Sequence, residues 1–96
     1  MNLSPVTSEY SASFRIAIGA RMRSARVAIG RNQEELAAHL GIARQTLAGY
    51  EKGHSEPLAS LLKRLCNDFE IDAGWLLLGD ETRPMFLPER ADRRGA

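Results

Sequence analysis

The chain has 96 residues, of which 44% are hydrophobic, and a formal net charge of +1. This length is enough for one small domain, and no apolar run is long enough to span a membrane. The single cysteine, Cys66, excludes an internal disulfide and a cysteine-rich metal site.

The charges are distributed unevenly along the chain. Residues 14–54 contain seven Lys or Arg against three acids, a net +4, whereas residues 55–82 contain two against six, a net −4. This asymmetry favours an anionic partner on one face. The N-terminus has no charged stretch followed by an apolar one, so it is not a secretory signal, and we expect a cytoplasmic protein.

The first helix is predicted from its apolar spacing. Residues 1–13 are polar and rich in serine, which predicts a flexible arm without phosphate contacts, because it contains no Lys or Arg. Ser13 can cap a helix that ends near Ile29, before Gly30. Its apolar residues recur three or four apart, a pattern typical of an amphipathic helix. They are Phe14, Ile18, Met22, Ala25 and Ile29.

A short second helix is predicted to follow Asn32. Asn32 can cap this helix, and Glu35 stands where a capping box requires it. Gln33 lies in the first turn, where exposed N–H groups and the positive end of the helix dipole suit a phosphate. Gly41 ends the helix, since glycine adopts the left-handed conformation without steric cost. The apolar face consists of Leu36, Ala37 and Leu40.

The third helix begins near Ala43 and buries Leu47 and Tyr50, which lie three residues apart. Residues four apart share a helix face, so the same geometry defines the outward face of this helix. It consists of Arg44, Gln45, Ala48 and Gly49.

The outward face suits contacts with DNA bases. Arg44 can form a bidentate pair with guanine, and Gln45 can do so with adenine. Ala48 offers only a methyl group, which suits a thymine methyl or a close approach. Thr46 is ambiguous between a phosphate contact and local capping.

The stretch from Gln33 to Gly53 resembles the helix-turn-helix of phage repressors, Cro proteins and the related XRE-type bacterial regulators. The family has a small residue at Ala37, glycine at Gly41, and a Glu-x-Gly sequence that is met here by residues 51–53. The positions of Leu47 and Tyr50 are aliphatic or aromatic in the family. The resemblance covers about residues 18–80 and implies an all-α, compact five-helix bundle, similar to the lambda-repressor-like DNA-binding domain.

The resemblance also implies roles for further residues. Arg26 and Glu51 are expected to form a partly buried structural ion pair. Asn32 and Gln33 would contact the DNA backbone, and Lys52 would lie along the phosphates. The chain would then comprise an arm (1–13), a helix-turn-helix domain (14–80) and a C-terminal tail (81–96).

Two residues depart from the family pattern. Ala43 replaces the usual Ser or Thr cap, which removes about 1 kcal/mol of helix stabilisation. Gly49 stands where many relatives have a base-reading polar residue, and glycine costs about 1 kcal/mol within a helix. Either the protein reads few bases and depends on DNA shape, or the helix contacts a partner other than DNA.

Two more helices are expected after the helix-turn-helix. Pro57 suits the first turn of a fourth helix, whose apolar residues recur at helical spacing. Asp72 can cap a short fifth helix, in which Trp75 and Leu76 close the core and Leu77 or Leu78 is available for a dimer contact. The apolar trio at 85–87 indicates a tail that packs on the domain or on a second subunit, although a disordered tail is equally consistent. The expected core residues of the fourth helix are Leu58, Leu61, Leu62, Leu65 and Phe69.

No catalytic or metal-binding pattern is present: the sequence has no phosphate loop, paired zinc histidines or nucleophile set. We therefore expect no enzyme, metal or cofactor. The sequence predicts a transcriptional regulator, more a repressor than an activator, that binds double-stranded DNA as a homodimer on a palindromic operator. The alternative is an antitoxin or adaptor whose helix-turn-helix contacts a protein partner.

Overall fold

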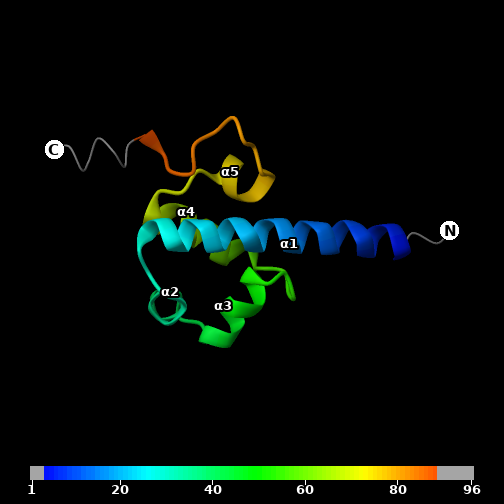
Figure 1. Ribbon diagram of the computed structural model, residues 1–96, viewed down its shortest axis with the longest axis horizontal. Coiled ribbons are helices and arrows are strands. Elements are labelled where there is room, and N and C mark those ends of the chain that lie inside the picture. The colour runs from blue at the N-terminus through cyan, green and yellow to red at the C-terminus, as the bar shows by residue number, and fades with distance from the viewer. Residues whose placement is uncertain (1–3, 89–96) are drawn as a thin grey trace.

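The structure, a computed structural model, describes residues 4–88 and contains five helices in that range (Figure 1). The all-α, five-helix fold class is therefore confirmed. An isolated antiparallel bridge pairs Ile71 with Phe86. The helices are α1 (Ser4–Ile29), α2 (Gln33–Leu40), α3 (Arg44–Glu51), α4 (Ala59–Phe69) and α5 (Ala73–Leu78).

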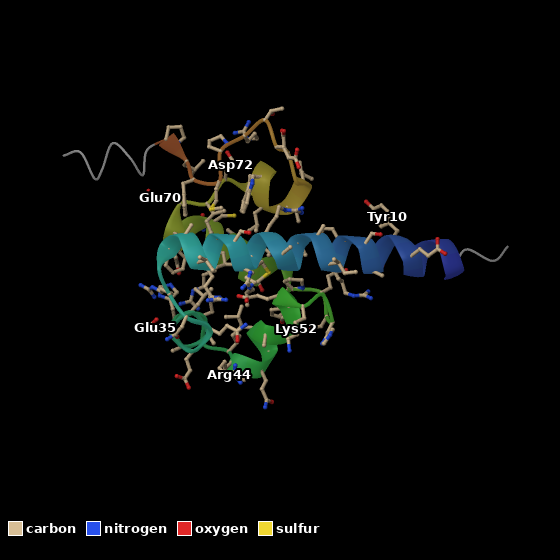
Figure 2. The ribbon with its side chains drawn as sticks, in the orientation of Figure 1. Tyr10, Glu35, Arg44, Lys52, Glu70 and Asp72 are labelled. Carbon is tan, nitrogen blue, oxygen red and sulfur yellow. The ribbon has the colours of Figure 1, made fainter. Side chains whose placement is uncertain are left out.

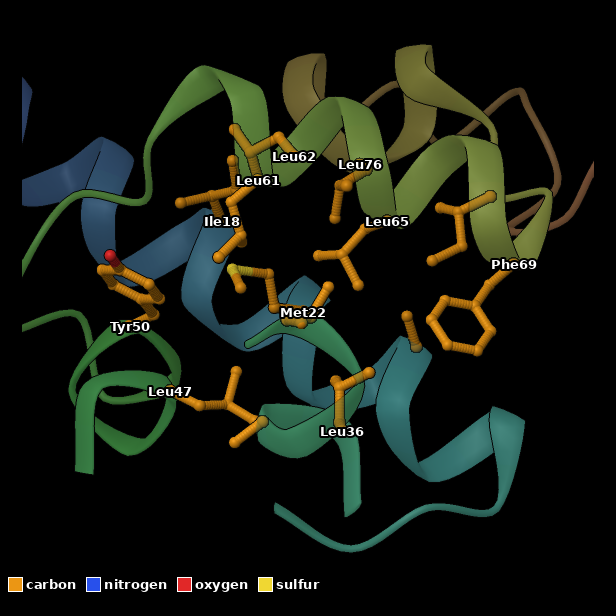
Figure 3. Close-up of a cluster of buried hydrophobic side chains, with 14 residues drawn as sticks. Ile18, Met22, Leu36, Leu47, Tyr50, Leu61, Leu62, Leu65, Phe69 and Leu76 are labelled. Carbon is orange, nitrogen blue, oxygen red and sulfur yellow. The ribbon is translucent and has the colours of Figure 1, made fainter. Parts of the chain in front are cut away.

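The long helix α1 crosses the whole molecule, with α2 and α3 on one side of it and α5 on the other (Figure 1). All five helices contribute to one apolar core (Figure 3). The largest fully buried side chains are spread over four of the helices and the segment before α5, so no single pair of helices holds the core alone. They are Ile18, Met22, Leu36, Leu47, Ile71 and Leu76.

The helix caps follow the predictions. Asn32 and Glu35 form the capping box at the start of α2, with donor–acceptor distances of 2.8 and 2.9 Å. Gly41 ends α2 in the left-handed conformation, with φ of 71°. Asp72 caps α5 by accepting a hydrogen bond from the Trp75 N–H at 3.0 Å. Ala43 precedes α3 without any side-chain cap.

Two helix starts differ from the prediction. α1 is already helical at Ser4 rather than after Ser13, so residues 4–13 of the expected arm are helical. Pro5 is compatible with this because a proline in the first turn removes no intrahelical hydrogen bond. α4 begins at Ala59, and the extended Leu58 before it is 64% exposed. The prediction of Leu58 as a core residue was wrong because the helical period does not apply to a residue outside the helix.

The segment after α5 packs against the domain. The Asp72 N–H donates to the Met85 carbonyl at 2.9 Å, and the Leu87 N–H donates to the Glu70 carbonyl at 2.8 Å. The Arg83 guanidinium lies 2.9 Å from the Asp72 carboxylate and holds the pKa of this carboxyl below its usual value. Within the described residues, the predicted tail therefore lies on its own domain; residues 89–96 lie outside them.

Gly19 allows the closest approach between α1 and α3. A Cβ atom added at Gly19 would lie 2.1 Å from the carbonyl oxygen of Tyr50, which is backbone and cannot rotate away. The apolar spacing of α1 does not predict this role for Gly19. By contrast, a Cβ added at Gly49 would meet only the Ser55 hydroxyl, at an ordinary 3.5 Å.

These two glycines give a matched pair for a stability test. Alanine favours a helix over glycine by about 1 kcal/mol, so Gly49→Ala should raise the free energy of unfolding. Gly19→Ala should lower it by about 1–3 kcal/mol, the usual cost of overpacking. Urea denaturation followed by circular dichroism measures both, and equal effects of the two substitutions would contradict a tight α1–α3 crossing.

Candidate nucleic-acid interface

The first turn of α3 contains three exposed residues, Arg44, Gln45 and Thr46. Leu47 and Tyr50 of the same helix are buried in the core. The Arg44 end of α3 is at the edge of the molecule furthest from α1 (Figure 2). A nucleic acid could therefore approach this end of α3 without any rearrangement of the domain.

The remaining predicted base-reading positions are less open. Ala48 and Gly49 are half-buried, and the missing side chain of Gly49 would face Ser55 in the segment after α3. The two positions present little more than backbone and a methyl group. They suit close approach of a partner rather than hydrogen bonding to it.

A buried ion pair joins α1 to the end of α3. Arg26 Nε donates to Glu51 Oε2 at 2.7 Å, and Arg26 Nη2 donates to Glu51 Oε1 at 3.1 Å. The Glu51 side chain is only 2% exposed, and the hydrogen bond that Arg26 donates to Glu51 raises the pKa of Arg26. Arg26 also donates to the Arg31 carbonyl at 2.9 Å. This is the pair expected from the sequence, and it fixes the C-terminal end of α3 against α1.

Gln33 extends this pair to the outward face of α3. Its Nε2 donates to Glu51 Oε1 at 3.0 Å, and its Oε1 accepts a hydrogen bond from Arg44 Nη1 at 3.1 Å. Arg44 is thus connected to the buried ion pair through one amide. The sequence analysis missed this connection; the available signal was that Gln33 and Arg44 each begin a helix of the motif.

The other predicted backbone-contact residues lie at the ends of α2 and α3. The Asn32 side-chain oxygen accepts the Glu35 N–H, so its role in the structure is that of a cap. Lys52 is exposed and follows α3, on the α3 side of α1 (Figure 2). Next to it, the Gly53 carbonyl accepts a hydrogen bond from Arg15 Nε at 3.3 Å, which ties this turn to α1.

Two other kinds of site are absent from the described residues. No helix among them is long and apolar enough to cross a membrane. No group of three or more His, Cys, Asp or Glu side chains in the same range is placed to hold a metal ion.

The sequence model of a helix-turn-helix family matches residues 22–76, more than half of the chain. The chain belongs to the XRE-type helix-turn-helix family. The matched range includes α2, α3 and α4 entirely, together with both residues of the buried ion pair. This family membership confirms the resemblance inferred from the motif.

The chain is similar to curated regulators from two bacteria. The HTH-type transcriptional regulator ImmR of Bacillus subtilis (strain 168) is 32% identical over 66 residues, covering 69% of this chain and 52% of ImmR. The HTH-type transcriptional regulator DicA of Escherichia coli (strain K12) is 32% identical over 68 residues, covering 71% of this chain and 50% of DicA. The SPbeta prophage-derived uncharacterized HTH-type transcriptional regulator YonR of B. subtilis (strain 168) is 36% identical over 61 residues, covering 64% of this chain and 56% of YonR. The chain thus spans about half the length of these relatives, and no solved structure gives a significant match.

The buried pair can be tested by a double-mutant cycle in this helix-turn-helix domain. Arg26→Met alone should lower the free energy of unfolding by about 3 kcal/mol, because it leaves the Glu51 carboxylate buried without its counter-charge. Arg26→Met combined with Glu51→Leu should lower the free energy of unfolding by less than Arg26→Met alone. Arg23→Ala, an exposed change on the same helix, should alter stability by less than about 0.5 kcal/mol. Additive costs in the double variant would mean that the two side chains act independently.

Proposed function

We propose that this protein is a sequence-specific DNA-binding transcriptional repressor that binds a near-palindromic operator as a homodimer. In this proposal α3 enters the major groove and Arg44 and Gln45 read bases. The observation that carries the proposal is that Arg44 and Gln45 are exposed at the start of α3, with Arg44 held by Gln33. Family membership supports the regulatory role.

The hydrogen bond that Arg44 donates to Gln33 supports base reading by Arg44. A free arginine side chain loses about 2 kcal/mol of rotamer entropy when it is ordered. A side chain that is already held loses less of it on binding, and preorganisation of this kind improves affinity. The Gln33 amide is engaged by Glu51 and Arg44, so we propose that Gln33 contacts phosphate through its backbone N–H.

The net positive charge of the part of the chain that contains the helix-turn-helix supports an anionic partner. Residues 14–54, which include α2 and α3, have a net charge of +4. Within the proposed contact region, Lys52 would lie along the phosphates and Thr46 would add a hydroxyl contact. This is a modest set of phosphate contacts, and two copies on one operator would double it. Recognition helices of such dimers lie about 34 Å apart, one turn of DNA.

A second function is favoured by the small residues at Ala48 and Gly49 and by the net charge of −4 over residues 55–82. In this alternative the helix-turn-helix belongs to an antitoxin or adaptor and contacts a protein. The salt dependence separates the two functions. Binding to DNA weakens steeply with rising salt because counterions are released, whereas a largely apolar protein contact changes little.

The proposed function is tested by selecting bound duplexes from a random DNA pool at about 0.15 M salt, where non-specific binding is weak. We expect enrichment of an inverted repeat, which would also identify the operator. Enrichment of a single short half-site would retain DNA reading and remove the homodimer from the proposal. No enrichment with folded protein would favour the protein-partner function.

The operator so obtained allows a test of Arg44. Arg44→Ala should weaken operator binding by about 1–3 kcal/mol and relax preference at one base position. Fluorescence anisotropy against the operator and its single-base variants measures both effects. Arg23→Ala, which removes the same charge at an exposed position of α1, is the matched control. An equal loss on every sequence would show that Arg44 touches only phosphate.

A further inference from the structure

A groove with a volume of about 520 Å³ lies between α1 and α5. Tyr10 and Phe14 of α1 line one wall and Leu77 and Leu78 of α5 line the other; among the lining residues that the structure describes, Arg21 is the charged one. Tyr10 is 76% exposed and Leu78 is 78% exposed. Large apolar side chains gathered in this way, unlike single exposed ones, mark interaction surfaces.

The groove is held in shape by hydrogen bonds between the two helices. Arg21 Nε donates to the Leu76 carbonyl at 2.7 Å, and Arg21 Nη2 donates to the Leu77 carbonyl at 3.3 Å. These bonds attach the C-terminal half of α5 to the middle of α1. The two walls therefore exist before any partner binds, which reduces the cost of ordering the interface.

The first turns of α1 extend beyond the other helices (Figure 1). This overhang, residues 4–13, contains one charged residue, the acid Glu9. Arg21, which lines the groove beside it, carries a charge of opposite sign. The overhang and the groove thus belong to the same chain and are complementary in charge.

A dimer with a twofold axis can pair the overhang of each copy with the groove of the other. In an antiparallel crossing of two α1 helices in which Ser13 of one copy faces Ala17 of the other, the same register places Glu9 of one copy opposite Arg21 of the other. Ser13 and Ala17 are small and also line the groove, so they permit close approach. Tyr10 of each copy then enters the groove of the other. Such an isologous contact uses the same surface twice.

We propose that this groove, together with the overhang of α1, is the surface through which two copies of the chain associate. The proposal rests on the proposed function, since it supplies the homodimer that a palindromic operator requires. Tyr10 points to the side of α1 opposite α3 and Arg44 (Figure 2). Association through this groove therefore leaves the proposed DNA-contacting residues accessible.

The experiment is sedimentation velocity of the full chain without DNA, over a wide range of concentrations. Tyr10→Glu and Leu78→Glu should each raise the dissociation constant of the dimer by at least about 30-fold, the effect of losing a dominant interface side chain. Glu9→Lys should weaken the dimer at low salt more than at high salt, because it places two positive charges together. All three residues are exposed, and circular dichroism checks that each variant is folded.

Val27→Glu is the matched control, because Val27 lies on the same helix, is 58% exposed and does not line the groove. It should leave the dissociation constant unchanged. A wild-type chain that stays monomeric, or groove variants that dimerise as well as the wild type, would overturn the proposal, as would equal loss in the Val27 variant.

Binding to single half-sites separates this proposal from the proposed function. If the groove is the dimer surface, Leu78→Glu should keep the affinity for a half-site and lose the extra affinity for an inverted repeat. Dimers that depend on the groove but bind no DNA would support the interface and contradict the proposed function. A monomer that binds half-sites would overturn the interface and leave DNA binding in place.

Discussion

The buried carboxylate of Glu51 is the constraint on which the helix-turn-helix depends. An unpaired charge in the interior is costly, and this one is satisfied by donors from two other helices, Arg26 of α1 and Gln33 of α2. Because hydrogen bonds require specific distances and directions, the three helices have little freedom to slide past one another. Gly19 adds a steric constraint at the same crossing, since α1 there lies directly on the backbone of α3.

This arrangement links the stability of the domain to the proposed recognition of DNA. Gln33 uses one end of its amide for Glu51 and the other for Arg44, so the exposed guanidinium is positioned by the interior. The sequence departs from the family pattern at Ala43, which cannot cap α3 through its side chain. The hydrogen bond that Arg44 donates to Gln33 gives the start of α3 a contact to α2 that does not depend on that cap.

The helix α1 divides the molecule into two sides. On one side lie α2 and α3, with the proposed DNA-contacting residues; on the other lies α5, with the apolar groove (Figure 1). In the proposed dimer this separation keeps the contact with DNA and the contact with a second copy on different sides of one small domain. The segment that returns over Asp72 and ends in the pairing of Ile71 with Phe86 completes the α5 side.

Local patterns in the sequence determined the fold class, the buried stripe of α1 and the caps at Asn32, Gly41 and Asp72. Each of these depends on residues within about one helical turn, for which spacing and backbone preference are sufficient. The sequence also identified the residue types of the motif, and with them the family. The tertiary structure alone decided the close approach at Gly19 and the connection from Glu51 through Gln33 to Arg44. These features join residues far apart in the chain, and no local period encodes which of them meet when the helices pack.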